Sequence, residues 1–230
     1  MATSVVVTGA AGALGRAVMS DLRSRGVKTV VALDRPSAAL DEVGRSKGVH
    51  AIAVDLADRD AVRAAWEQID EIDEVATPDA LVALAGGFVP GSLADLDETT
   101  LDGLWHTNVG SLLWCAQAAA SRMASSGGGS IVTVGSKTAV SGAAPVGHAA
   151  TKAAVVRVTE LLAEELRGSG IRANAVLPSV IDTPANRTWM SESLAARAVP
   201  PAAIAKVIAF LVSDDAWPIS GAAIPVYGDA

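Results

Sequence analysis

Cysteine, aromatic residues and positive charge are all scarce in this sequence. The single cysteine, Cys115, excludes an intramolecular disulfide framework and predicts a reducing compartment, the cytoplasm. The formal net charge of −7 argues against nucleic acid or an anionic membrane as a partner. Aromatic residues make up only 3% of the chain, so the position of each one is informative.

Long uninterrupted apolar runs are also missing. Half of the residues are apolar, yet no stretch of about 18 residues lacks a charge, a proline or a polar break, so we predict no transmembrane helix. The opening segment "MATSVVVTGA" has no basic region before its apolar run, which is too short for a signal peptide. The 230 residues suit one large domain over 1–230 and are too few for two comfortable ones.

What the chain does contain is a regular alternation of strand-like and helix-like segments. Seven short apolar runs are candidate strands, at 4–8, 28–34, 49–55, 79–85, 130–134, 171–177 and 222–227. Helical patterns lie between them, the first with Leu14 and Val18 on one face and others near 58–72, 98–124, 148–168 and 199–213. Continuous apolar runs are typical of parallel strands buried on both faces by crossover helices. We predict an α/β fold: a single-domain, Rossmann-type, doubly wound parallel sheet of about seven strands with helices on both faces.

A glycine-rich segment, "TGAAGALG", lies between the first strand and the first helix. Gly9, Gly12 and Gly15 permit a tight turn, close approach of the backbone to a pyrophosphate, and contact between helix and sheet. Asp34 and Asp55 end the second and third strands, where carboxylates can meet the adenosine ribose and the adenine. Each aspartate alone is equally typical of a helix N-cap or a solvated loop. Together with the glycines they predict a dinucleotide site.

The second strand also bears on the choice of cofactor. Asp34 favours NAD(H), because a carboxylate repels a 2′-phosphate, and the glycine segment carries no basic residue. Arg35 follows directly and could clasp that phosphate, so NADP(H) stays open as the alternative.

The segment "TGAAGALG", with the spacing T-G-x-x-G-x-x-G, resembles the glycine-rich turn of the short-chain dehydrogenase/reductase family, and the likeness covers essentially the whole chain. Further matching segments are "LVALAGG" (81–87), "HTNVGSLLW" (106–114), "IVTVGSK" (131–137) and "GIRANAVLPSVIDTP" (170–184). Within the family, "VALAGGF", "GSKTAV" and "AVLPSVIDTPANRTWM" resemble dihydropteridine reductases most closely. The resemblance implies cofactor-binding roles for Gly9, Ala11, Gly12, Leu14, Gly15, Asp34, Arg35, Asp55, Leu56, Ala85, Gly86, Lys152, Pro178, Val180 and Thr183.

The family moves a hydride between the nicotinamide and a carbonyl, alcohol or imine carbon, while a tyrosine four residues before a lysine moves the proton. Here the lysine is Lys152, and His148 stands at the tyrosine position in "HAATK". Four residues are about one helical turn, so both side chains lie on one face. The only tyrosine, Tyr227, is in the last predicted strand. The resemblance further implies catalytic roles for Ser136, otherwise a strand-end turn residue, and for Asn108, a poor helix former placed mid-helix.

His148 leaves several interpretations open. The histidine can replace tyrosine as the acid/base, with a reference pKa of about 6.5 that predicts a break in activity near pH 6–7. Alternatively, an activated imine or quinonoid substrate takes its proton from solvent. A third interpretation is that redox chemistry is lost, naturally or by a deliberate exchange of tyrosine for histidine, leaving elimination, isomerisation or a cofactor-binding scaffold. A fourth is that His148 only packs at a helix start.

The remaining expectations concern the substrate and assembly. We predict a small-molecule substrate and no metal site, with an apolar pocket formed by Phe88, Val140, Trp189 and Met190, the last two on a substrate loop at about 180–198. The helices at 98–124 and 148–168 are apolar around much of their circumference, which favours a homodimer or homotetramer.

Overall fold

The computed structural model describes residues 2–75 and 77–229, and it confirms the predicted parallel sheet. Seven strands form one sheet in the order β3-β2-β1-β4-β5-β6-β7, and every neighbouring pair is parallel. The strands are β1 (Ser4–Thr8), β2 (Thr29–Asp34), β3 (Val49–Ala53), β4 (Ala80–Ala83), β5 (Gly129–Val134), β6 (Ile171–Pro178) and β7 (Ala223–Val226). Each lies within about two residues of the segment predicted for it.

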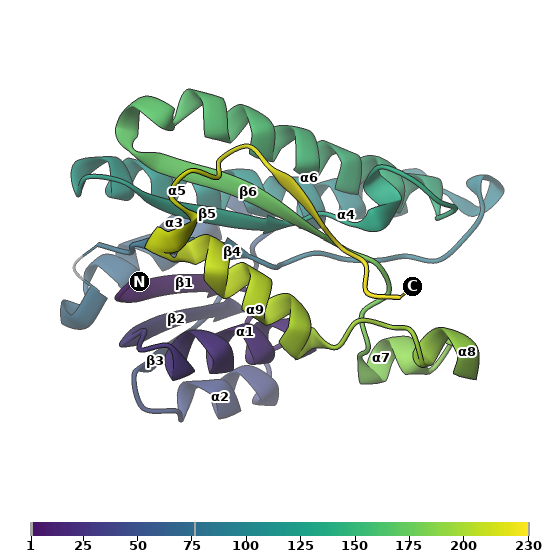
Figure 1. Ribbon diagram of the computed structural model, residues 1–230, viewed down its shortest axis with the longest axis horizontal. Helices are drawn as coiled ribbons and strands as arrows, with labels where there is room; N and C mark the ends of the chain where they lie inside the picture. Colours follow the sequence, from purple (N-terminus) through teal and green to yellow (C-terminus); the bar gives the residue numbers. More distant parts are fainter. Residues whose placement is uncertain (1, 76, 230) are drawn as a thin grey trace.

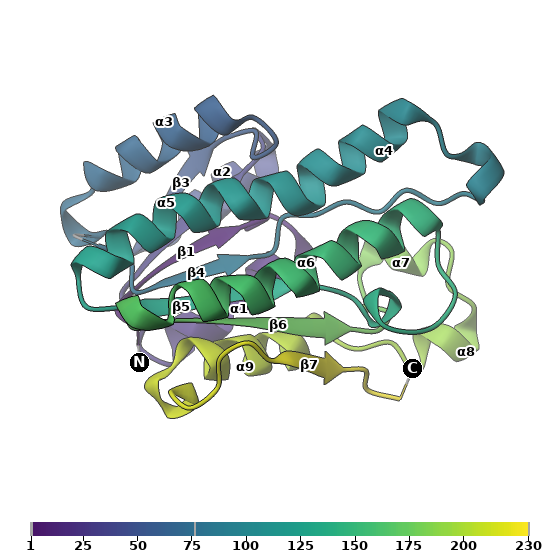
Figure 2. The same cartoon turned by 90° about the horizontal axis from the view of Figure 1, so that it is seen from above.

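Helices cover both faces of the sheet and create two apolar layers. On one face lie α1 (Ala13–Ser24), α2 (Ala38–Gly44) and α9 (Pro201–Val212), and on the other lie α3 (Arg59–Asp70), α5 (Ser111–Ser125) and α6 (Val146–Glu165) (Figures 1 and 2). Val18 and Ile208 belong to the first layer, and Trp66 and Met123 to the second, all of them buried. Strands between two such layers are buried on both sides, which explains their unbroken apolar sequences.

The long helix predicted at 98–124 is interrupted in the structure. It is divided into α4 (Glu98–Trp105), a π-helical turn (His106–Gly110) and α5, which continue one another along the molecule (Figure 2). π-turns are rare and are frequent at functional sites. Asn108 lies in this turn and is buried, so the interruption falls on a candidate catalytic residue.

The parallel arrangement brings the carboxyl ends of the strands to one edge, which is also where α7 (Pro184–Arg187) and α8 (Glu192–Ala195) lie (Figure 1). The chain order reverses between β1 and β4, the position at which doubly wound sheets bind ligands. Within the described part of the chain, no helix has the length and apolar character needed to cross a membrane.

Candidate active site

A cleft of about 900 Å³ opens at the reversal between β1 and β4. Its volume is sufficient for a dinucleotide-sized ligand. Predicted cofactor residues form much of its lining: Gly9, Gly12, Leu14, Gly15, Asp34, Arg35, Asp55, Leu56, Ala85, Gly86 and Thr183. Ala11, Lys152, Pro178 and Val180 are not among the lining residues of this cleft.

The glycine segment forms a tight turn from β1 into α1. Gly9 has φ +64°, a left-handed conformation that favours glycine. Gly15 lies so close to the turn that a Cβ there would come within 2.3 Å of the Gly9 carbonyl oxygen. No side chain caps the N-terminus of α1, and its first turn has no acidic residue. Its backbone N–H groups therefore face the cleft in the way that binds an anion, and this part of the cleft fits a pyrophosphate.

Asp34 and Asp55 have different partners. The Asp34 carboxylate accepts hydrogen bonds from the backbone N–H of Ala11 at 2.8 Å and of Arg35 at 2.8 Å. Ala11 thus acts by tying the glycine turn to the end of β2. Asp55 accepts from the backbone N–H of Ala57 at 3.0 Å within its loop.

Thr8 joins β1 to the segment that follows β4. Its hydroxyl oxygen accepts hydrogen bonds from the backbone N–H groups of Leu84, at 3.1 Å, and Ala85, at 3.0 Å. These contacts fix the backbone that leads to Gly86 and Gly87, where the cleft meets the candidate catalytic side chains.

Asn108 fixes the same segment from the other side. Its Oδ1 accepts from the Gly87 N–H at 2.7 Å, and its Nδ2 donates to the Gly87 carbonyl at 3.2 Å and to the Thr151 hydroxyl at 2.9 Å. Every contact satisfies a polar group that burial would otherwise leave unpaired. Asn108 therefore connects the segment after β4 to α6, the helix that carries His148 and Lys152.

Lys152 is buried beside this network. Its Nζ donates to the Val134 carbonyl at 2.9 Å, and burial lowers its pKa to about 8. A Cβ placed on Gly86 would lie 3.1 Å from Nζ and 2.9 Å from Asn108 Oδ1. The ammonium and the amide oxygen therefore converge on the backbone of Gly86, which lines the cleft.

His148 lies one helical turn before Lys152 and is half-buried. Its Nδ1 is 3.3 Å from the Gly87 carbonyl oxygen, which can only accept a hydrogen bond, so this contact places the hydrogen on Nδ1 and leaves Nε2 free. The Phe88 ring meets the imidazole edge-on, with centroids 5.0 Å apart. The pKa of His148 is lowered, first by burial and then by the charge of Lys152, while the Gly87 contact opposes this shift.

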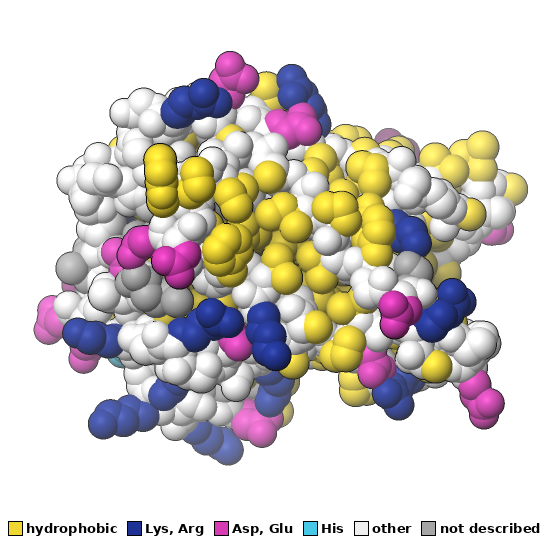
Figure 3. All heavy atoms as spheres, viewed as in Figure 1, with side chains coloured by type: hydrophobic (Ala, Val, Ile, Leu, Met, Phe, Trp, Pro, Cys, Tyr) yellow, Lys and Arg dark blue, Asp and Glu magenta, His cyan; other side chains and the backbone are white. Residues whose placement is uncertain are grey.

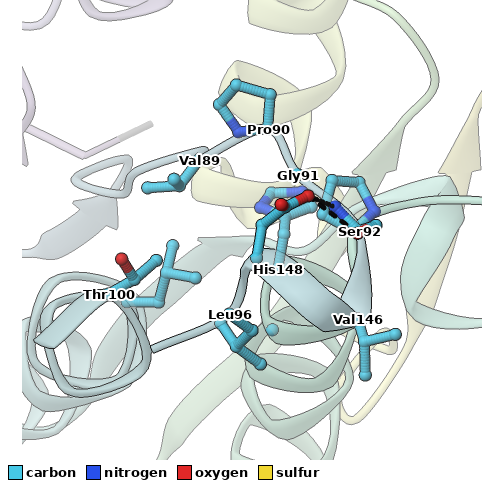
Figure 4. Close-up of a pocket in the computed structure, with 12 residues that line it drawn as sticks. Val89, Pro90, Gly91, Ser92, Leu96, Thr100, Val146 and His148 are labelled. Carbon is cyan, nitrogen blue, oxygen red and sulfur yellow. Dashed lines mark hydrogen bonds between the residues drawn. The ribbon is translucent and has the colours of Figure 1, made fainter. Parts of the chain in front are cut away.

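A small pocket of about 40 Å³ also borders His148. It lies between the segment after β4, with Val89 and Leu96, and the start of α6, with Val146 (Figure 4). This volume suits a few water molecules at most. The pocket therefore gives the imidazole a neighbouring solvent space rather than a second ligand site.

The other candidate catalytic and substrate residues are less closely associated with His148 and Lys152. Ser136 caps a short 3-10 turn, with its hydroxyl 2.8 Å from that of Thr138. Phe88 is 52% exposed beside His148. Val140 and Trp189 are exposed on two other segments, and Met190 is half-buried. Apart from Phe88, these residues have no contact with His148 among the interactions of the described chain, and they remain predictions.

Several residues that line the cleft were not predicted from the sequence. They are Ala13, Arg16, Val54, Ala57, Leu84, Gly87, Thr107, Ser111, Pro184 and Ala185. Thr107 and Ser111 flank Asn108 on the interrupted helix, and Pro184 follows Thr183 at the start of α7. The sequence signal that could have identified them is that most of them lie next to residues already predicted to bind the cofactor or to act in catalysis. The described residues contain no group of three or more histidine, cysteine or acidic side chains arranged to hold a metal ion.

Comparisons with known proteins agree with this architecture. Residues 3–193 match the family model described as short chain dehydrogenase. The chain is 32% identical to a meso-2,3-butanediol dehydrogenase of Serratia marcescens, over 98% of this chain and 93% of that one. It is also 32% identical to the 3-oxoacyl-[acyl-carrier-protein] reductase MabA of Mycobacterium tuberculosis, over 98% and 91%. A 3-ketoacyl-(acyl-carrier-protein) reductase from Brucella melitensis, solved as a complex with NADH, superimposes with a TM-score of 0.89 at 28% identity, covering 98% of this chain and 97% of that one.

Proposed function

The chain belongs to the short chain dehydrogenase family, and from this premise we propose that it is an NAD(P)(H)-dependent oxidoreductase in which His148 moves the proton. The reaction is hydride transfer to or from a small carbonyl, alcohol, imine or quinonoid ring compound. The observation that carries the proposal is the convergence of His148, Lys152 and Asn108 on Gly86 and Gly87, which line the dinucleotide-sized cleft.

The nicotinamide cofactor supplies or receives the hydride when bound. The N-terminus of α1 would hold its pyrophosphate, and Asp34 its adenosine ribose. Lys152 Nζ lies beside Gly86, 3.1 Å from the position that a Cβ on Gly86 would take. From there Lys152 is suited to hold the nicotinamide ribose by donating to its hydroxyls. The negative charge of Asp34 favours NAD(H), and Arg35 beside it is the feature that would favour NADP(H).

His148 acts through Nε2, because Nδ1 faces the Gly87 carbonyl. In the oxidative direction neutral Nε2 takes the proton from an alcohol oxygen or an amine nitrogen of the substrate. In the reductive direction the imidazolium returns that proton to the same atom. The pKa of His148 is depressed by burial and by Lys152, so the neutral base is the prevailing form at pH 7.

A planar, partly apolar substrate suits the surroundings of His148. The exposed Phe88 ring beside the imidazole offers a stacking surface, and Trp189, which is 54% exposed on the loop at 180–198, offers another. The resemblance of this loop to dihydropteridine reductases supports a quinonoid or imine ring as the first class to test. We also propose a homodimer or homotetramer, supported by exposed Phe210 and by Trp217, which is 77% exposed, on a molecule with a broad apolar face (Figure 3).

Turnover tests the proposal directly. Purified protein is mixed with NADH or NADPH and a panel of ketones, imines and quinonoid pterins, and the nicotinamide absorbance is followed. We expect substrate-dependent oxidation that His148→Tyr lowers at least about tenfold, because the longer phenol lacks the Gly87 contact and places its proton at a different position from Nε2. His50→Tyr, a change of the same kind on β3, should leave the rate unchanged.

Two results would contradict the proposal. Absence of turnover across the panel, with the dinucleotide bound, would favour a non-redox descendant or a scaffold. A rate raised by His148→Tyr would mean that the histidine impairs a tyrosine-dependent reaction.

A further inference from the structure

A second cavity, of about 570 Å³, lies outside the cleft described above. It is formed by α1, by α2 with the turn that follows it, and by Val49 at the start of β3. Met19, Val43 and Val49 are buried residues of its lining. The six other lining residues are polar or charged: Arg16, Ser20, Arg23, Glu42, Ser46 and Lys47.

The charge of this cavity is positive, although the whole chain carries −7. Three cations line it, against the single carboxylate of Glu42. Glu42 is 2.8 Å from Arg16 and is neutralised by it. The charges of Arg23 and Lys47 are thus left without a carboxylate in the lining of the cavity. Lys and Arg side chains gather at the lower part of the face in Figure 3, where α1 and α2 lie in Figure 1.

Arg23 is a half-buried cation of this lining, and no carboxylate among the described residues is paired with it. Its Nη1 is enclosed by the protein without a hydrogen-bond partner among the described residues, so it is the remainder of the guanidinium that an anion in the cavity can meet. By contrast Arg25, at the end of the same helix, is paired with Asp21 at 2.7 Å.

We propose that this cavity binds the phosphate group of a small phosphorylated molecule. The Arg23 guanidinium donates to the phosphate oxygens as a planar fork, which is the geometry that makes arginine a common phosphate ligand. Lys47 adds a second positive charge, and the Ser20 and Ser46 hydroxyls are further donors. The cavity is much larger than a phosphate ion, so the buried apolar residues are left to contact the rest of the molecule.

The cavity also adjoins the dinucleotide cleft through Arg16, which lines both. Arg16 Nε donates to the Ala11 carbonyl in the glycine turn at 3.1 Å, while Nη2 donates to the Ala39 carbonyl at 3.3 Å and to Glu42. The Arg16 side chain is thus occupied between the two sites, and Arg23 belongs to the second cavity alone. A substitution of Arg23 therefore tests the second cavity without changing the lining of the dinucleotide cleft.

Calorimetric titration with ribose 5-phosphate and with inorganic phosphate tests the assignment, with the cleft first saturated with NADH. We expect one site per chain, and tighter binding of ribose 5-phosphate, which fills more of the cavity. Arg23→Gln should weaken binding at least about tenfold, and Lys47→Gln about threefold. Arg25→Gln removes the same charge from the same helix outside the cavity and should leave the affinity within about twofold of wild type.

Three outcomes would overturn the site: no saturable heat with either probe up to about 10 mM, equal weakening by Arg23→Gln and Arg25→Gln, or loss of binding when NADH is added. Equal affinity for the two probes would keep the phosphate site and make the free ion its ligand. Should Arg23→Gln fail to fold, Lys47→Gln, at an exposed position, gives the same test. If the protein binds no NADH, the titration without it still depends on Arg23, so failure of the cleft and failure of this cavity are distinguishable.

Discussion

The immediate neighbours of His148 orient its imidazole ring. The Gly87 carbonyl orients one ring nitrogen, the Phe88 ring covers an edge, and Lys152 lies one turn further along α6. The sequence alone predicted the pairing of His148 with Lys152, because residues four apart share a helix face. The Gly87 contact was beyond sequence analysis, since it depends on how the segment after β4 is held by Asn108 and Thr8.

The lowered pKa of His148 gives a pH dependence with a definite sign. Burial and Lys152 disfavour the imidazolium, so the break expected near pH 6–7 from the reference value moves below 6.5. In the oxidative direction kcat/KM should rise with pH through that lowered pKa and level off towards neutrality, because only neutral Nε2 accepts the proton. Reduction, which needs the imidazolium, should fall with pH across the same range.

Initial rates measured in both directions from about pH 5 to pH 8 check this expectation, because histidine side chains titrate within this range. His148→Gln, which cannot titrate, should lose the break in both profiles along with most of the rate. A break that persists in this variant would assign the titration to another group, and a flat wild-type profile would remove His148 from proton transfer.

At the scale of elements, the π-turn at His106–Gly110 separates α4 from α5 and places the Asn108 amide against the segment after β4. The sequence predicted one helix over this whole region because the apolar spacing continues across it. A one-residue widening of the helix leaves almost no trace in that spacing. It was the poor helix propensity of Asn108 that pointed to a special role.

The end of β4 must approach α4–α5 and α6 closely, and Gly86 allows it. A Cβ at Gly86 would lie 2.9 Å from Asn108 Oδ1 and 3.1 Å from Lys152 Nζ, so Gly86→Ala should push both groups outward. Displacements of about 1 Å at a reacting centre can cost roughly a hundredfold in rate, and we expect kcat/KM to fall about ten- to a hundredfold.

Gly103→Ala is the matched control, because a Cβ at that position in α4 meets nothing within 4 Å. It should leave kcat/KM unchanged and stabilise the protein by about 0.5–1 kcal/mol, the usual gain from replacing glycine in a helix. Unchanged activity in Gly86→Ala would show that the close approach has no role in placing Lys152 and Asn108.

At the scale of the molecule, the alternation of apolar runs was sufficient to predict about seven parallel strands, since buried strands and crossover helices have distinct periods. The short helix α2, with seven residues, has too few turns to show a period and was missed. The cavity beside it could not be predicted, because it depends on how α1 and α2 pack over β3. The strand-end aspartates could be predicted, because the topology of a parallel sheet is sufficient to bring Asp34 and Asp55 to the ligand-binding edge.

Cofactor preference is expressed in the stability of the whole chain, because a ligand that binds only the folded state stabilises it. At a concentration about 100 times its Kd, a dinucleotide adds roughly 2.7 kcal/mol to the free energy of unfolding. For a chain of this size each kcal/mol raises the Tm by about 2–4 °C, so NADH should raise it by about 5–11 °C in a thermal melt.

NADPH at the same concentration should give a clearly smaller shift in Tm, because its 2′-phosphate would approach the Asp34 carboxylate. Asp34→Asn removes the charge and keeps one of the two acceptor oxygens that bind the Ala11 and Arg35 N–H groups, and it should narrow the difference between the two shifts. A larger shift with NADPH in the wild-type protein would instead assign the site to NADP(H), with Arg35 as the residue that outweighs Asp34.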